Sequence, residues 1–152
     1  MTMRHVLINK AKTYILLIEV LKGLDVFVGR LKDLHFKKGF YLYIGSAKKA
    51  FRARIQRHLA RTKNIFWHID YLLSSNDAKI KQIWTINKDK ECKIAQFLCK
   101  KGYSFINRFG SSDYNCHSHL FFINKGARET QGLLKKRGFI KYADKNYCSW
   151  LN

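Results

Sequence analysis

The sequence predicts a single α+β domain built around an antiparallel sheet. Closely spaced apolar segments near the N-terminus have the composition of strands, and longer segments further along place apolar residues at helical spacing. Proline is absent and the glycines are scattered, so no linker composition divides the 152 residues. We therefore expect one domain over residues 1–152, large enough to bury a core of its own.

Three strands are expected in the first third of the chain. Tyr14–Val20 is an apolar run that only Glu19 interrupts, and it is typical of a buried strand. Val26–Val28 follows a turn as a short strand, and Phe40–Ile44 is an aromatic third strand. Their close spacing favours an antiparallel meander.

A helix is expected from about Ala47 to Arg61, with Ser46 as its N-cap. Its apolar stripe at four-residue spacing consists of Phe51, Ile55 and Leu59. Arg54 and His58 are also four residues apart and border this stripe, at the edge of the buried face. Arg52 and Arg57 are expected to project further toward solvent.

The remaining expected elements follow in chain order. They are a largely buried helix at Asn64–Ser74, a strand at Ile80–Ile86, a helix at about Asp89–Lys101, a strand at Ser104–Arg108, a loop at Phe109–Asn115, a strand at His119–Ile123 and a helix at Glu129–Arg137 that stops at Gly138. The last residues show no clear pattern. Tyr142, Tyr147 and Trp150 indicate that they pack against the domain.

The charge of the chain points to a polyanionic partner. Thirty Lys and Arg against ten Asp and Glu leave a net charge of +20 at pH 7. The segment 34–69 contains nine basic residues and no acidic one, which favours nucleic acid over a membrane surface. We expect nucleic-acid binding by Lys48, Lys49, Arg52, Arg57, Arg61, Lys63 and Ser46. The alternative for such a run is a solvated helix face.

Glu91 is the strongest single candidate for a catalytic or metal-binding residue. It falls inside the apolar arc of its expected helix, where a carboxylate needs a compensating group. A divalent cation would compensate it, because Mg2+ in phosphoryl-transfer sites is often held by one or two carboxylates plus water and phosphate. The competing interpretation is a first-turn glutamate that the helix dipole favours.

The tyrosines, Arg54 and His58 could act on a phosphodiester. Tyr41 and Tyr43 share one face of their strand, and Tyr14 could reach the same face. Neighbouring Lys and Arg would stabilise a phenolate, so that a tyrosine could deprotonate a water. Arg54 could bind a phosphate, and His58 could protonate a leaving group or position the base. The alternative to a catalytic role is that each of these residues is a structural residue of the core.

Other candidates are weaker. The four cysteines, Cys92, Cys99, Cys116 and Cys148, match no zinc template and are expected to be reduced thiols. The segment Cys116–His119 lacks the second half of a zinc site. His68 is expected to be a hydrogen-bonded residue of a buried helix. No segment approaches the ~20 apolar residues of a membrane span, and we expect a soluble, cytoplasmic protein without a membrane partner.

Taken together, these motifs resemble the GIY-YIG nuclease superfamily. Tyr43-Ile44-Gly45 matches its second signature tripeptide, Arg54 matches the arginine of the following helix, and Glu91 stands at its metal-binding glutamate. Lys12-Thr13-Tyr14 stands where the superfamily has Gly-Ile-Tyr. Further motifs resemble one branch, the small, mainly archaeal GIY-YIG-like domain of unknown function: Arg54-Ile55-Gln56-Arg57-His58, Trp67-His68-Ile69-Asp70-Tyr71, Phe109-Gly110-Ser111-Ser112-Asp113 and His119-Leu120-Phe121.

The resemblance covers about residues 12–123 and leaves 124–152 as a C-terminal extension. It implies a small, mainly antiparallel mixed sheet flanked by helices, and Mg2+- or Mn2+-dependent hydrolysis of a phosphodiester. Glu91 would hold the metal, Tyr14 or Tyr43 would lie near the attacking water, and Arg54 would contact phosphate. Members fused to endonuclease III-like repair glycosylases point to DNA rather than RNA, in repair or on branched DNA.

Two hypotheses of different classes follow. The first is a metal-dependent DNA endonuclease. The second is a nucleic-acid-binding module that keeps the fold and the basic face without cleaving. Oligomeric state is left open by the sequence.

Overall fold

The computed structural model describes residues 10–48, 50–111, 116–124 and 126–142. Within them, six strands form one sheet in the order β6-β7-β4-β1-β5-β8, and β2 and β3 form a separate hairpin. The strands are β1 (Thr13–Val20), β2 (Leu24–Phe27), β3 (Asp33–Phe36), β4 (Gly39–Ser46), β5 (Ala78–Ile86), β6 (Ser104–Phe105), β7 (Leu120–Ile123) and β8 (Ile140–Tyr142). All described strand pairs are antiparallel. The predicted α+β class is confirmed.

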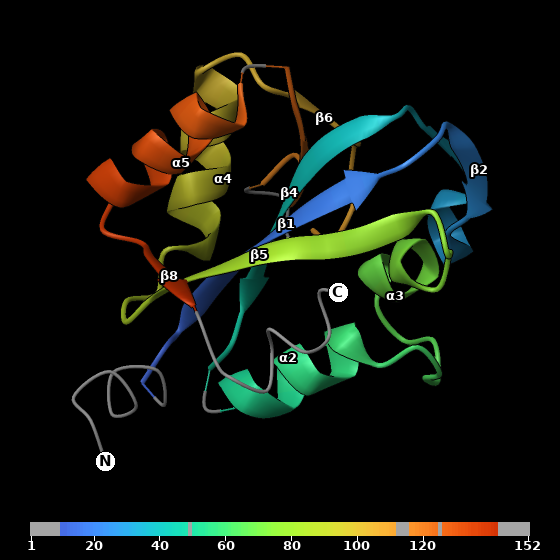
Figure 1. Ribbon diagram of the computed structural model, residues 1–152, viewed down its shortest axis with the longest axis horizontal. Coiled ribbons are helices and arrows are strands. Elements are labelled where there is room, and N and C mark those ends of the chain that lie inside the picture. The colour runs from blue at the N-terminus through green and yellow to red at the C-terminus, as the bar shows by residue number, and fades with distance from the viewer. Residues whose placement is uncertain (1–9, 49, 112–115, 125, 143–152) are drawn as a thin grey trace.

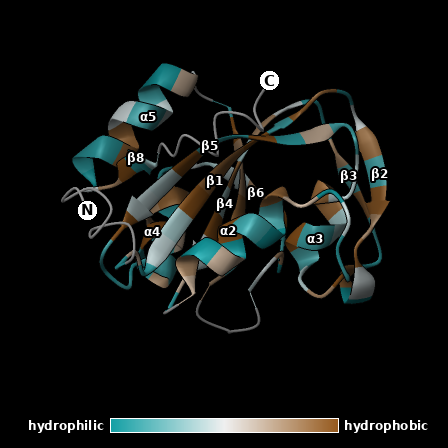
Figure 2. Cartoon of the chain, turned by 60° about the horizontal axis from the view of Figure 1, so that its bottom comes forward, coloured by the Kyte–Doolittle hydropathy of each residue, from teal (hydrophilic) through white to brown (hydrophobic). Residues whose placement is uncertain are grey.

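In the part of the chain that the structure describes, four α-helices cover the sheet (Figure 1). They are α2 (Phe51–Leu59), α3 (His68–Leu73), α4 (Glu91–Lys100) and α5 (Ala127–Lys136). Helices α2 and α3 lie on one side of the sheet and α4 and α5 on the other. A short 3-10 turn, Gly29–Leu31, joins β2 to β3. Figure 2 shows long hydrophilic stretches along α2 and α5.

Strand β1 is the centre of the sheet and divides the core in two. It pairs with β4 on one edge and with β5 on the other. Tyr14 and Leu16 point into the cluster beneath α2 and α3, whereas Ile15 and Leu17 point into the cluster beneath α4 and α5. Because both faces are covered, β1 reads as a continuous apolar run rather than an alternating one.

The expected meander of the first three strands is wrong. β1 pairs directly with β4, and the residues between them leave the sheet as the β2-β3 hairpin. Strand β3 was not expected. It has only four residues, and the polar Asp33 and His35 alternate with Leu34 and Phe36, so the segment is too short and too polar to stand out as a strand. A hairpin that is half exposed carries a weaker sequence signal than a strand buried on both faces.

The helices on the α2 side begin later than expected. Ser46 is not an N-cap, because it is the last residue of β4 and pairs with Thr13 of β1; the residue before α2 is Ala50. The expected helix at Asn64–Ser74 is reduced to α3, which starts at His68. The expected strand Ser104–Arg108 is likewise reduced to the two residues of β6.

The C-terminal half follows the expectation more closely. Strand β5, helix α4 with its buried Ile94, Ala95 and Leu98, strand β7 and helix α5 all form. Gly138 follows α5 with a φ of +90°, which suits a glycine after a helix end. Strand β8 pairs with β5 and buries Tyr142, while Tyr147 and Trp150 lie outside the described residues.

No helix in the described part of the chain is long and apolar enough to cross a membrane.

Candidate active site

The candidate residues gather at one end of the sheet, where β1 begins and β4 ends. Tyr14 and Gly45 are directly opposite each other in these two strands. A Cβ on Gly45 would lie 2.2 Å from Cζ of Tyr14, so the phenol ring occupies the space that a side chain at position 45 would need. The glycine of the Tyr-Ile-Gly tripeptide is therefore required by packing.

Tyr14 reaches from β1 to the helix α2. Its hydroxyl lies 2.6 Å from Nε2 of His58, and both side chains are buried, with 1% and 3% of their residue surfaces exposed. The tautomer of the imidazole decides which of the two atoms donates the hydrogen bond. Nδ1 of His58 is buried without a hydrogen-bond partner. Residues far apart in sequence thus form one buried polar pair.

Burial controls the protonation of this pair. Desolvation, reinforced by the positive charge of Lys63, lowers the pKa of His58 to about 4, so the imidazole is neutral near pH 7. Burial also raises the pKa of Tyr14, and the nearby Arg54 guanidinium offsets this only in part. The expectation that basic residues would stabilise a phenolate is wrong here, because the desolvation of the charged form is the larger effect.

Tyr43 shares the environment of Tyr14. It is buried, its ring centroid lies 6.1 Å from that of His58, and burial raises its pKa well above the usual value. Gly110, with a φ of +72°, brings its backbone so close that an added Cβ would be 3.2 Å from the Tyr43 ring and 3.3 Å from Cβ of His119. Tyr43 is consequently enclosed by the loop before β7.

Arg54 lies at the edge of the buried face of α2, as expected. Its Nη1 donates to the carbonyl oxygen of Ser46, and its guanidinium lies over the Trp67 ring, 5.2 Å from the centroid. The positive charge favours the ionised form of Tyr14 and of Tyr43. The guanidinium is half-buried and therefore keeps access to solvent.

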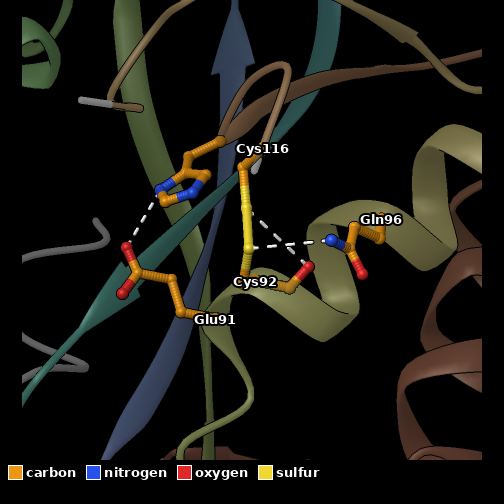
Figure 3. The surroundings of a disulfide bond; sticks show 5 residues. Glu91, Cys92, Gln96 and Cys116 are labelled. Atoms are coloured by element: carbon orange, nitrogen blue, oxygen red, sulfur yellow. Dashed lines mark hydrogen bonds and ion pairs between the residues drawn. A yellow bond between two sulfur atoms is a disulfide. The ribbon is translucent and has the colours of Figure 1, made fainter. Parts of the chain in front are cut away.

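Glu91 is the first residue of α4, and its side chain is 27% exposed. Its Oε1 lies 2.9 Å from Nδ1 of His119, the ion pair at the left of Figure 3. The carboxylate raises the pKa of both Tyr14 and Tyr43, the same phenols that Arg54 influences. Glu91, Arg54, Tyr14, Tyr43 and His58 therefore share one neighbourhood.

A cation could be held here only with help from water and substrate. The described residues contain no group of three or more His, Cys, Asp or Glu side chains that could hold a metal. Glu91 is a single, partly exposed carboxylate, and this donor set fits Mg2+ or Mn2+ bound through one carboxylate, water and a phosphate. It does not fit a zinc site made of protein ligands alone.

The basic residues divide into two groups. Lys48, Arg52 and Arg61 are exposed, and Lys49 lies outside the described residues. Lys63 is half-buried and donates to the carbonyl oxygen of His58 at 2.9 Å. Burial, reinforced by Arg57, lowers its pKa although Asp70 acts in the opposite direction.

Arg57 does not project toward solvent as expected. Its Nη2 is 2.6 Å from Oδ2 of Asp70, its side chain is 28% exposed, and its guanidinium lies 4.9 Å from the centroid of Trp67. Asp70 is fully buried, which is why it draws a positive charge inward. A direct role of Arg57 in nucleic-acid binding is therefore disfavoured by its engagement with Asp70.

Asp70 is a residue that the sequence interpretation missed. Its Oδ2 also accepts hydrogen bonds from the backbone N–H groups of Phe66 and Trp67, at 3.0 and 2.9 Å. Burial alone would raise the pKa of Asp70, but these backbone groups and Arg57 hold it below its usual value. An acidic residue three positions after a helix N-cap is the signal that could have revealed it.

Two histidines complete the surroundings. His68 accepts a hydrogen bond at Nδ1 from the backbone N–H of Gly110 at 3.0 Å, which confirms the expected hydrogen-bonded role, and burial lowers its pKa. The sequence motifs that contain His119, Cys116–His119 and His119-Leu120-Phe121, name no partner for its side chain. Its pairing with Glu91 joins the loop before β7 to α4, a contact that sequence spacing cannot reveal.

The expectation of reduced thiols is wrong for one pair. Cys92 and Cys116 form a disulfide next to Glu91 (Figure 3), because α4 and the segment before β7 bring their Cα atoms to 6.1 Å. Cys99 is a free cysteine, and Cys148 lies outside the described residues. The disulfide links the two segments that supply Glu91 and His119.

Comparison with known proteins gives a family but no activity. Neither the curated proteins nor the solved structures contain a match to this chain. A family model, DUF123, described as a domain of unknown function, matches residues 13–138. This range includes every residue considered for catalysis or nucleic-acid binding and extends through α5, beyond the expected limit at residue 123. The chain belongs to the DUF123 family.

Proposed function

We propose that this protein is a divalent-metal-dependent endonuclease of GIY-YIG type that hydrolyses phosphodiester bonds of DNA. The observation that carries the proposal is that Tyr14 and Tyr43 both lie against His58 on α2, the helix that also carries Arg54. On the other side of Tyr43, Glu91 pairs with His119, whose Cβ lies next to the Gly110 backbone that contacts the Tyr43 ring. A guanidinium, a carboxylate and two phenols at one end of a sheet are the groups that phosphodiester hydrolysis requires. Their match to the Tyr-Ile-Gly, arginine and glutamate motifs supports the same conclusion.

Arg54 would bind the phosphate. Its contacts with Ser46 and Trp67 fix the guanidinium plane, and an arginine fixed in this way can donate two hydrogen bonds to phosphate oxygens. Such donors stabilise the negative charge that develops on the non-bridging oxygens in the transition state.

Tyr14 and His58 would move the proton of the attacking water together. A buried phenol with a raised pKa is a poor base by itself. If the hydroxyl of Tyr14 donates to Nε2 of His58, its oxygen can accept a proton from water while its own proton passes to the neutral imidazole. His58 can then return this proton toward the leaving oxygen.

Glu91 is the residue that would hold the cation. Mg2+ or Mn2+, when bound, would neutralise charge on the phosphate and favour an activated water. His119 would orient the carboxylate through its hydrogen bond at 2.9 Å. Exposure of about a quarter of the Glu91 side chain leaves room for solvent and substrate at the carboxylate.

DNA as the substrate and a cytoplasmic location are parts of the same proposal. The charge of +20 and the acid-free segment 34–69 support a polyanion, and the relation to domains fused with repair enzymes favours DNA in repair or at branches. The exposed side chains of Lys48, Arg52 and Arg61 on or next to α2 are the described groups best placed for backbone contacts.

A cleavage screen tests this proposal. The parent protein is incubated with single-stranded, duplex, flap and branched DNA, and with RNA of the same sequence, under Mg2+, Mn2+ or EDTA. We expect cleavage of at least one DNA structure only with metal. Arg54→Ala should remove it, whereas Arg52→Ala, a matched change of an exposed arginine on the same helix, should affect binding more than the rate of cleavage.

The second candidate is a binding module without hydrolytic activity. Two observations favour it: Glu91 is already paired with His119, and both phenols are held in the protonated form. It predicts salt-dependent binding with no product from any substrate under any metal. The same screen separates the two candidates, because only the first yields cut strands.

A further inference from the structure

The most exposed large hydrophobic side chain in the described part of the chain is not used by the proposed catalytic groups. Phe66 is 78% exposed, and its neighbour Ile65 is 42% exposed. They lie in the segment between α2 and α3, so most of the Phe66 ring contributes nothing to the core. An exposed aromatic ring of this kind is available to a ligand.

The backbone beneath this ring is firmly held. The N–H of Phe66 and the N–H of Trp67 both donate to the buried carboxylate of Asp70, and Arg57 neutralises that carboxylate at 2.6 Å. Arg57 also donates to the carbonyl oxygen of Asn64. A ring carried on an anchored backbone loses little conformational freedom when it binds.

The ring also connects to the proposed phosphate-binding residue. Phe66 meets Trp67 edge-on, with ring centroids 5.9 Å apart and an angle of 74° between the ring planes. Arg54 lies over the other ring of this pair at 5.2 Å from its centroid. A strand whose phosphate is held by Arg54 would therefore bring a neighbouring base toward Phe66.

The local charge suits a nucleic acid. Phe66 lies in the segment 34–69, which has no acidic residue, and Arg61 is an exposed basic neighbour in sequence. The first acid that follows, Asp70, is buried and paired. A polyanion is attracted to such a surface, and an aromatic ring among basic side chains is the usual composition of a single-strand binding site.

A second exposed phenylalanine shows the contrast. Phe27, at the end of β2, is 58% exposed and meets Tyr71 edge-on at 6.4 Å. Its cross-strand partner is Asp33, and Asp25 lies in the same strand. Two carboxylates therefore lie in the hairpin that carries Phe27, whereas the segment that carries Phe66 has none. The two rings share chemistry and exposure and differ in the charge around them.

We infer that Phe66 is a stacking site for an unpaired nucleobase of the strand that Arg54 contacts. The inference rests on the proposed function and narrows it to substrates with unpaired bases. A base inside a duplex is already stacked on its neighbours, whereas a base in a single-stranded tail, flap or junction presents a free face. The preference for such structures would arise at Phe66.

The test measures binding separately from cleavage. Affinity is determined in EDTA, at one fixed salt concentration, for a blunt two-stranded DNA duplex and for the same duplex with a single-stranded tail containing 2-aminopurine. The variants are Phe66→Ala, Phe66→Leu, Phe66→Tyr and, as the matched control, Phe27→Ala. Circular dichroism confirms that each variant is folded, and sedimentation of the protein alone records its oligomeric state.

We expect Phe66→Ala to weaken binding of the tailed duplex about 5- to 150-fold, the range that loss of one base-stacking contact gives, and to leave binding of the blunt duplex unchanged. Phe66→Leu should behave like Phe66→Ala, because it keeps an apolar group but loses the ring. Phe66→Tyr should restore both affinity and the quenching of 2-aminopurine. Phe27→Ala should equal the parent.

Equal losses for the tailed and the blunt duplex, or equal affinities of Phe66→Ala and Phe27→Ala for the tailed duplex, would overturn the inference. A change of oligomeric state in Phe66→Ala without a tail-specific loss would also overturn it, and would assign the ring to a protein interface. The outcome is independent of hydrolysis. A tail-specific loss in a protein that never cuts DNA would support the stacking site while rejecting the proposed endonuclease.

Discussion

The ring of Tyr14 lies against Gly45, its cross-strand partner, at a distance that leaves no space for a Cβ. This contact links the tripeptide at the end of β4 to the tyrosine at the start of β1. It also directs the Tyr14 hydroxyl away from the strand and toward His58 on α2. The glycine of the motif thus determines where the phenol lies.

Gly45→Ala should destabilise the protein by about 2 kcal/mol or more, because the new methyl group overlaps the Tyr14 ring and forces it to move. Gly132→Ala is the matched control. Gly132 lies inside α5 with open space around it, and the change should raise stability by up to about 1 kcal/mol. Urea unfolding measures both values. Equal effects would contradict the packing argument.

The free energy of unfolding should decrease as the pH is lowered through the range in which His58 titrates. The unfolded imidazole titrates near pH 6.5 and the folded one near 4, so between these values the unfolded state binds more protons. Lowering the pH through this window should cost up to about 3 kcal/mol from this group. His68, with its own lowered pKa, acts in the same direction. The difference between the parent and His58→Gln in the free energy of unfolding, measured against pH, isolates the contribution of His58. If the two proteins show the same pH dependence, the burial of His58 as a neutral base is contradicted.

Asp70→Asn should destabilise the protein by about 3 kcal/mol, because it leaves the Arg57 guanidinium without its anion and disturbs two backbone hydrogen bonds. The control is Asp77→Asn. Asp77 pairs with the exposed Lys22 at 3.7 Å, and its loss should change stability by less than about 1 kcal/mol. Thermal unfolding of both variants is the measurement, and comparable values would refute the distinction.

Cys92→Ser should lower stability by about 3 kcal/mol under non-reducing conditions, since the disulfide to Cys116 closes a loop with a sequence separation of 24. Cys99→Ser removes a free thiol and should have little effect. A reductant should abolish the difference between parent and Cys92→Ser. Alkylation followed by mass spectrometry provides the direct check, and a Cys92 that reacts in the unreduced protein would exclude the bond.

The sequence predicted the strands and helices with strong apolar periodicity. Tyr14–Val20, Ile80–Ile86 and the helix carrying Ile94 and Leu98 are close to β1, β5 and α4. It did not predict β3, in which polar residues alternate with apolar ones, or the late start of α2. Boundaries depend on pairing, as Ser46 with Thr13 shows, and pairing is not visible in a local pattern.

For the site, the sequence suggests candidate residues but neither their protonation states nor their partners. The structure brings Arg54, Glu91 and the two tyrosines into one neighbourhood, and their catalytic roles stay predictions. The phenols stay protonated because the cost of burying a phenolate is larger than the effect of the nearby positive charge. Glu91 pairs with His119 because α4 packs against the segment before β7. Both depend on tertiary packing. A run of basic residues does not reveal the buried Asp70, so the sequence alone predicts that Arg57 faces solvent.

The most direct test of the central claim is the single-turnover rate of DNA cleavage by Glu91→Gln, compared with Glu129→Gln. Both glutamates lie in the first turn of a helix, but Glu129 is exposed at the start of α5. We predict that Glu91→Gln lowers the metal-dependent rate by about 100-fold or more and leaves DNA affinity nearly unchanged, while Glu129→Gln matches the parent. Equal rates for the two variants, or no cleavage by the parent, would contradict the account.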